Sequence, residues 1–220
     1  MNDDALRRIW LCADDYGLAE GVNRAIRDLI SRGRLNATSV MVVGLAIGRA
    51  EVTALQDIAA ASPRCAIGLH TTLTAPFRPL TMHFRPLNGG LFLPFPAMLR
   101  SGLLRLLDPE LIEDELLAQL AAFKELFGRA PDFVDGHQHV QLFPQVRDAF
   151  LRAVKEAAPG AWVRQGGRRK PLAKLVGAPK ALVLDVLSAQ FRKRATDAKS
   201  RSTPPSPAPM IFRKRPISPC

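Results

Sequence analysis

The chain has 220 residues, 47% of them hydrophobic, which is enough for one domain with a sizeable core. It has no run of 18 or more apolar residues and begins with the acidic stretch MNDD, so we expect neither a membrane-spanning helix nor a secretory signal and predict a cytoplasmic protein. Its three cysteines are too few and too far apart for a disulfide framework or a four-cysteine zinc site.

The formal net charge of +11 belongs to the C-terminal quarter. Residues 161–220 hold 14 Lys and Arg against 2 Asp and Glu, whereas residues 1–160 hold 17 against 18. A nucleic-acid surface is one interpretation, built on Arg164, Arg168, Arg169, Lys170, Arg192, Lys193 and Arg194. A solvated helix face explains these charges more simply, because no aromatic residues are interleaved among them. We therefore predict no nucleic-acid partner.

Strand-like and helix-like segments alternate along the chain. Residues 8–13 are apolar without alternation, as in a strand buried on both faces, and residues 20–32 carry apolar side chains at helical spacing. The same patterns predict further strands at 37–43, 64–69, 133–135 and 161–164, and further helices at 48–61, 109–127, 144–157 and 171–199. Residues 71–107 form a long connection, typical of a functional loop or a small inserted element. This alternation predicts an α/β fold with a parallel sheet wrapped by helices.

Polar side chains end three of the predicted strands. Asp14 and Asp15 follow the first strand, His70 follows the third, and His137 and His139 follow the fourth on a segment that we expect to be extended. The carboxyl ends of parallel strands converge on one rim, so these groups should meet. A carboxylate with two imidazoles matches a divalent-cation site, and a second carboxylate can take a proton from water. Taken singly, paired aspartates more often cap a helix, and a lone histidine is more often structural.

Four motifs resemble those of the YdjC-like carbohydrate deacetylases, the family of the chitooligosaccharide and hopanoid-associated deacetylases. They are ADDYGL at residues 13–18, VNRAI at 22–26, GLH at 68–70 and FVDGHQHV at 133–140. The resemblance covers roughly residues 7–190. It implies a distorted TIM-like (β/α) barrel, a divalent metal held by one Asp and two His, hydrolysis of the N-acetyl group of an acetylated amino sugar or oligosaccharide, and a homodimer.

Carried over to this chain, the resemblance implies Asp15, His70 and His137 as ligands of Mg²⁺ or Zn²⁺, with Asp14 as the general base. The two aspartates could exchange these roles. His139 is then a catalytic or substrate-contacting residue, or a ligand in place of His137.

The substrate side of the site is expected around the long connection. The backbone N–H of Tyr16 is a candidate to bind the developing oxyanion, and Phe77 and His83 are candidates to face the sugar. Phe84, Phe92 and Phe95 are further stacking candidates, although we expect more of these rings to pack than to bind.

The chain departs from the family pattern at its end. Family members usually continue with more strands and a late histidine, whereas no histidine follows His139 here and residues 201–216 are rich in Pro and Arg. We therefore expect a barrel domain at 1–195 that is incomplete at its C-terminal end, and a disordered tail at 196–220, as in a truncated or frame-shifted member. The alternative function is a catalytically impaired homologue that only binds metal or carbohydrate.

Overall fold

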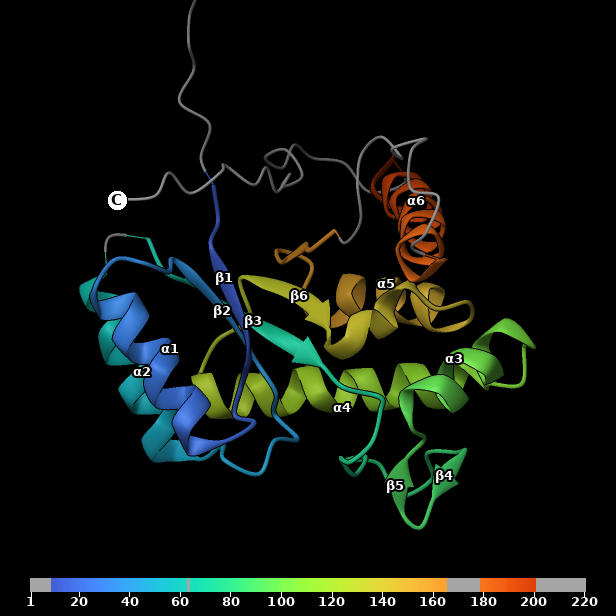
Figure 1. Cartoon of the computed structure of the whole chain (residues 1–220), viewed down its shortest axis with the longest axis horizontal. Coiled ribbons are helices and arrows are strands. Elements are labelled where there is room, and N and C mark those ends of the chain that lie inside the picture. Colours follow the sequence, from blue (N-terminus) through green and yellow to red (C-terminus); the bar gives the residue numbers. More distant parts are fainter. Residues whose placement is uncertain (1–8, 63, 166–178, 201–220) are drawn as a thin grey trace, which may run out of the picture.

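The computed structural model describes residues 9–62, 64–165 and 179–200 (Figure 1). At its centre is one sheet with strand order β1-β2-β3-β6-β7, in which every pairing is parallel. The strands are β1 (Cys12–Tyr16), β2 (Ala37–Val40), β3 (Ala66–Thr71), β6 (Phe133–Gly136) and β7 (Trp162–Val163). The predicted α/β fold with a parallel sheet is confirmed.

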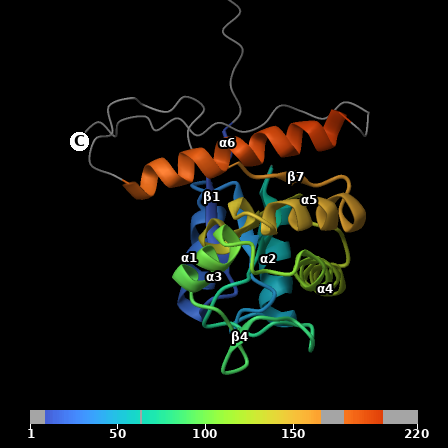
Figure 2. The same ribbon diagram turned by 90° about the vertical axis from the view of Figure 1, so that its right-hand side faces the viewer.

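Helices pack around this sheet, as expected from the alternating pattern. They are α1 (Glu20–Ser31), α2 (Arg49–Ala61), α4 (Pro109–Phe127), α5 (Val146–Ala157) and α6 (Pro179–Ser200). Figure 1 shows α1 and α2 together on the side of β1 and β2, whereas α5 and α6 lie beyond β6. In Figure 2, α6 runs across one end of the molecule, next to α5. No helix among the described residues combines the length and the apolar character that a bilayer crossing requires.

The long connection contains an inserted element, as predicted. Strands β4 (Leu87–Asn88) and β5 (Leu91–Phe92) form an antiparallel hairpin, and helix α3 (Phe95–Leu103) follows. Helix α4 then begins where the sequence indicates. The Asp108 side chain accepts hydrogen bonds from the backbone N–H groups of Glu110 and Leu111, and Pro109 occupies the first turn. The helix ends at Gly128, whose φ of 67° is the left-handed conformation that glycine adopts most easily.

The two faces of the sheet carry different side chains. The face toward the helices is lined by aliphatic residues such as Val40, Leu69 and Val134, which belong to the main core. The opposite face holds a smaller cluster in which the Phe133 and Trp162 rings stack with centroids 4.4 Å apart. Gly68 makes room for it, because a Cβ there would lie 2.5 Å from the Phe133 ring. The alternation of faces follows from the two-residue period of a strand.

The sheet is strongly curled. In a flat sheet, five strands about 4.8 Å apart would separate the first from the last by about 19 Å. Here the Trp10 ring, just before β1, lies 6.1 Å from the Trp162 ring on β7. Within the described part of the chain, β1 and β7 are the edges of the sheet and are not paired with each other, so these strands form an open barrel wall.

Several expected boundaries shift. The first strand starts at Cys12 instead of residue 8, so Asp14 and Asp15 lie inside it, and the preceding Ile9 and Leu11 are each 51% exposed instead of buried. His70 likewise lies inside its strand. The expected domain boundary at residue 195 falls within α6, and most of the predicted tail, residues 201–220, lies outside the described residues, as do residues 171–178 of the last predicted helix.

Candidate metal centre

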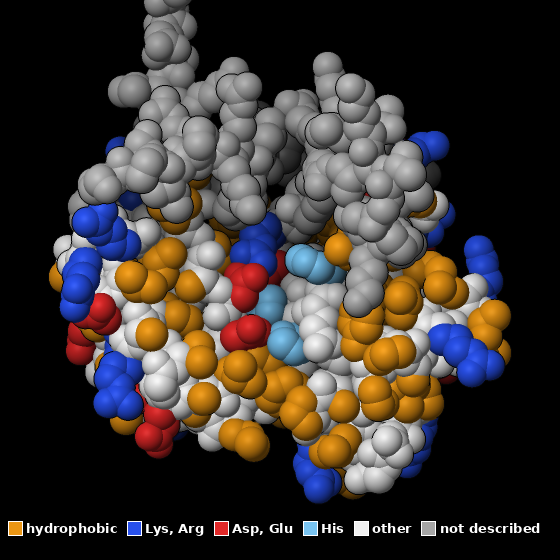
Figure 3. All heavy atoms as spheres, viewed as in Figure 1, with side chains coloured by type: hydrophobic (Ala, Val, Ile, Leu, Met, Phe, Trp, Pro, Cys, Tyr) orange, Lys and Arg blue, Asp and Glu red, His pale blue; other side chains and the backbone are white. Residues whose placement is uncertain are grey.

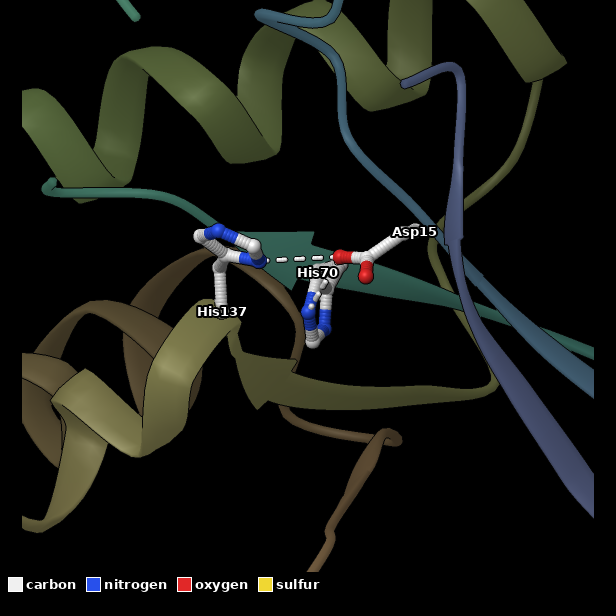
Figure 4. A group of neighbouring side chains, drawn as sticks. All are labelled: Asp15, His70 and His137. Atoms are coloured by element: carbon white, nitrogen blue, oxygen red, sulfur yellow. Dashed lines mark hydrogen bonds and ion pairs between the residues drawn. The ribbon is translucent and has the colours of Figure 1, made fainter. Parts of the chain in front are cut away.

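Three of the predicted ligands converge at the carboxyl ends of their strands. Figure 4 shows Asp15 from β1, His70 from β3 and His137 from just after β6 pointing toward one another. One ligand atom from each lies within 4.8 Å of the others. The Asp15 Oδ1 atom is 2.9 Å from His137 Nδ1 and 3.2 Å from His70 Nε2. One carboxylate and two imidazoles in this arrangement could hold a divalent cation.

A local irregularity in β1 brings Asp15 to this position. Neighbouring residues of a regular strand point to opposite faces, yet Asp14 and Asp15 both contribute to the charged group at this rim. The β1–β2 register shifts between Ala13 and Tyr16, and Asp15 adopts a φ of 67°. Such a bulge re-aims a side chain, and aspartate tolerates the left-handed region better than most residues.

The turn after β1 is locked by the VNRAI motif. The Asn23 side chain is fully buried, accepts a 2.6 Å hydrogen bond from the backbone N–H of Gly17, and donates one of 2.8 Å to the carbonyl of Ala46. Gly17 has a φ of 100°, and a Cβ there would lie 2.8 Å from the Met41 carbonyl oxygen, so glycine is required. This motif therefore supports the strand end that carries the aspartates.

Tyr16 belongs to the same support. Its side chain is fully buried, and its hydroxyl donates to Glu51 and accepts from Arg27. Burial raises the pKa of the Tyr16 phenol to about 12. The side chain thus packs among α1 and α2, whereas the expected contact of the Tyr16 backbone N–H with the developing oxyanion stays a prediction.

Asp135 orients the buried imidazole of His70. The His70 Nδ1 atom lies 2.5 Å from Asp135 Oδ1, while Nε2 faces Asp15. Burial disfavours the charged imidazole, but the charge and hydrogen bond of Asp135 outweigh it and raise the pKa of His70 to about 9. A carboxylate on the far nitrogen of a metal-binding histidine is the usual arrangement at such sites. The residues present therefore fit a divalent cation.

Asp14 is held by Arg164 from the opposite edge of the sheet. Two guanidinium nitrogens lie 2.6 Å from the two Asp14 oxygens, and Arg164 Nε lies 3.0 Å from Asp135 Oδ2. Burial alone would raise the pKa of Asp14, but the hydrogen bonds and charge of Arg164 lower it below the ordinary value. Figure 3 shows acidic and histidine side chains gathered beside a basic one at the centre of this face.

The charges at this centre match one divalent ion. The carboxylates of Asp14, Asp15 and Asp135 contribute three negative charges and Arg164 one positive charge. When both imidazoles are neutral, as metal ligands are, the balance is two negative charges, which a divalent cation would neutralise. Without an ion, His70 carries a proton at neutral pH, because its pKa is raised to about 9, and it would release this proton when the ion binds. Charges at a partly buried site need such compensation.

The histidine pair does not lie on an extended segment, so that expectation is wrong. Residues His137–Leu142 form the 3₁₀ segment η1, in which Gln138 and His139 have left-handed φ values of 54° and 60°. His139 is not part of the group that Asp15, His70 and His137 form, and it is more exposed than His137 although its ring is still partly buried. Partial burial of its ring, together with the positive charge of Arg164, lowers the pKa of His139.

The two remaining candidates differ in position. Phe77 is buried, and its ring lies edge-on to the His137 ring with centroids 5.8 Å apart. His83 is exposed and lies 3.3 Å from Asp114 on α4, so it pairs with that helix and not with the three ligands. Of the other phenylalanines, Phe84 and Phe92 pack against each other, and Phe95 packs against Phe143.

Sequence reasoning missed the supporting roles of Asp135 and Arg164. The signal for Asp135 was available, because a charged residue inside a buried strand needs a partner. Arg164 lies at the end of the last predicted strand, but the many basic residues around it in the sequence hide this signal. Ser39, whose hydroxyl lies 3.2 Å from both Asp14 Oδ1 and His70 Nδ1, carried no sequence signal.

Comparison with known proteins agrees with this fold. A "putative cellobiose-phosphate cleavage protein" from Enterococcus faecalis V583 has a similar structure, with a TM-score of 0.63 and 19% identity over 86% of this chain and 64% of that one. A lactam utilization protein from Thermus thermophilus gives a TM-score of 0.49 and 16% identity over 88% of this chain and 64% of that one. The chain thus spans slightly less than two thirds of the length of each. The sequence model of the YdjC-like protein family matches residues 8–210, which include every residue of the centre, and the chain therefore belongs to the YdjC-like family.

Proposed function

We propose that the protein is a metal-dependent carbohydrate deacetylase that hydrolyses the N-acetyl group of an acetylated amino sugar or oligosaccharide. The observation that carries this proposal is the meeting of Asp15, His70 and His137 beside a second, separately held carboxylate, Asp14. Family membership supports a hydrolase acting on carbohydrates. The name of the E. faecalis protein also refers to a carbohydrate.

Different residues of the centre have different roles in amide hydrolysis. A bound Mg²⁺ or Zn²⁺ supplies Lewis-acid polarisation of the acetyl carbonyl and lowers the pKa of water. Arg164 keeps Asp14 ionised at neutral pH, so this carboxylate is ready to take the proton of the attacking water. His139, whose pKa is lowered, is unprotonated at neutral pH and can accept a proton and pass it to the leaving amine.

The geometry supports one assignment among those left open by the sequence. Asp15 faces both imidazoles, whereas Asp14 faces Arg164, so we assign Asp15 to the metal and Asp14 to the proton. His137, and not His139, completes the ligand set. Phe77, edge-on to His137, remains our candidate for a wall of the sugar pocket, and His83 a candidate for its rim.

Acetate release tests the proposal directly. Chelator-treated protein should release no acetate from N-acetylated chitooligosaccharides, and added Mg²⁺ or Zn²⁺ should restore release. Asp14→Asn should lower kcat at least about 100-fold while the metal stays bound, because it removes the base and not a ligand. Asp28→Asn, an exposed residue on α1 paired with Arg32, is the matched control and should leave kcat unchanged.

A metal-loaded protein that binds the oligosaccharide but releases no acetate would contradict the proposed activity. That result would favour the alternative of a homologue that only binds metal or carbohydrate. We also propose a homodimer, for which light scattering of the purified protein should give twice the 24.1 kDa chain mass.

A further inference from the structure

The segment that follows His70 is attached to one helix at both of its ends. Gln119 and Glu115 lie one turn apart on α4, and both are fully buried. The Gln119 amide binds the near end of the segment, accepting a 2.9 Å hydrogen bond from the Thr72 N–H and donating one of 2.8 Å to the Thr72 carbonyl. It thereby pairs with the chain as a neighbouring strand would.

Glu115 binds the far end of the same segment. Its Oε1 accepts from the Leu80 N–H at 3.0 Å and from the Gln119 amide at 2.9 Å. Its Oε2 accepts from the N–H and the hydroxyl of Thr81 at 2.9 and 2.8 Å. All four donors are neutral, so the buried negative charge depends on these bonds. Because a buried carboxylate without its donors is costly, the chain at residues 80–81 is held firmly in this conformation.

Between the two anchors, the segment carries Phe77 to the metal centre. The Phe77 carbonyl accepts a 2.9 Å hydrogen bond from the Phe92 N–H, which ties the segment to the inserted hairpin. The buried Phe77 ring then meets the His137 ring at 89°, edge to face. His137 comes from η1, whose left-handed backbone is unusual, so contacts to its ring help to fix where Nδ1 points.

We propose that Glu115 and Gln119 are positioning residues for the metal centre: they clamp residues 72–81 so that Phe77 holds the His137 ring in its ligand orientation. This inference rests on the proposed function in one respect, which is that the centre binds a divalent cation. It assigns a role at the site to a helix that contributes no ligand.

Zn²⁺ affinity of the chelator-treated full chain, measured by calorimetry, tests the clamp. Glu115→Gln places an amide NH₂ against N–H donors, which should release residues 80–81 and weaken Zn²⁺ binding about tenfold, within the usual range for outer residues of metal sites. Glu125→Gln, an exposed residue on the same helix, is the matched control and should bind Zn²⁺ like wild type. Phe77→Leu should weaken binding by a similar factor.

The double variant separates a positioning role from a general loss of stability. If the clamp acts through Phe77, the double variant will raise the dissociation constant about as much as either single variant, whereas independent effects would multiply. Thr81→Val removes only one of the four bonds to Glu115 and should weaken Zn²⁺ binding about threefold. It provides the test if Glu115→Gln does not fold.

The outcomes are distinct. Wild-type affinity in folded Glu115→Gln or Thr81→Val, or multiplicative effects in the double variant, would overturn the clamp. A wild-type chain that binds neither Zn²⁺ nor Mg²⁺ would overturn the proposed metal dependence and the clamp together. Zn²⁺ binding without acetate release would contradict only the proposed activity.

Discussion

The two adjacent aspartates at the centre have different neighbours, and our proposal gives them different roles for that reason. Asp15 receives hydrogen bonds from His137 and His70, which hold its pKa well below the ordinary value. Asp14 faces the guanidinium of Arg164, which also holds its pKa low. Both are carboxylates at neutral pH, but only Asp15 shares its surroundings with two imidazoles.

The Asp135–His70 pair should matter for metal affinity although Asp135 is not a proposed ligand. Asp135→Asn removes the charge that orients His70, and we expect Zn²⁺ affinity to fall about 10- to 100-fold, measured by competition with a chelating dye. Asp114→Asn, an exposed acidic residue beside His83, is the control and should leave affinity unchanged. Wild-type affinity in Asp135→Asn would show that His70 is oriented by other contacts.

The Glu51 carboxylate should give the fold a defined pH dependence. Burial raises its pKa, but hydrogen bonds from Arg27, Tyr16 and Asn23 outweigh this and lower it from the ordinary 4.5. A lowered carboxyl pKa means that the stabilisation is complete above pH 4.5 and is lost as the pH falls through the folded-state value. In urea denaturation, the unfolding free energies of wild type and Glu51→Gln should differ by a constant amount from pH 7 to 5 and converge below about pH 4.5. A difference that does not change down to pH 3.5 would contradict this.

At the level of single residues, the sequence predicts the three converging groups because each lies close to the end of a recognisable strand. It could not assign the two aspartates, since that depends on the bulge and the left-handed φ of Asp15. It also could not pair Arg164 with Asp14, because the residues are 150 positions apart and only the curl of the sheet brings them together.

At the level of elements, local signals were most reliable where capping chemistry is strong. Helix α4 begins at its Asp-Pro pair and stops at its glycine as predicted. The segment after β6 is not predictable in this way, because two consecutive non-glycine residues with positive φ have no sequence signature. Strand ends were also placed too early, since Asp14 and His70 are polar residues that continue a strand instead of ending it.

Two glycine substitutions should have opposite effects on stability. Gly68→Ala on β3 forces a methyl group against the Phe133 ring, and we expect the unfolding free energy to fall by about 1–3 kcal/mol. Gly21→Ala in α1 meets no atom within 4 Å and should raise it by about 0.4–1 kcal/mol. Chemical denaturation of both variants checks the signs, and a neutral Gly68→Ala would mean that the Phe133 cluster rearranges easily.

At the level of the whole molecule, the strands follow one another across the sheet in chain order, and the last described helix covers the segment that carries the site. Helix α6 packs on α5 and η1. Its Phe191 is fully buried, with its ring 5.9 Å from that of Phe150. The sequence predicts a helix here. It does not show which element the apolar side chains of this helix contact, because the many basic residues around them obscure the apolar face.

Removing the Phe191 ring should therefore destabilise the fold. Phe191→Ala is expected to lower the unfolding free energy by about 3–5 kcal/mol. Val186→Ala, at a side chain that is 49% exposed on the same helix, should change it by less than about 0.5 kcal/mol. Urea denaturation distinguishes the two, and equal effects would show that α6 contributes little to the core.

The proposed ligands are distributed widely along the chain: Asp15 and His137 are 122 positions apart. An ion that joins them would act as a removable cross-link between the first strand and the fourth strand of the sheet. Since unfolded chains cannot present both groups together, the ion should favour the native state by about 2.7 kcal/mol at a concentration 100 times its dissociation constant. Melting temperature would then report on occupancy, and chelation would expose the first strand to proteases.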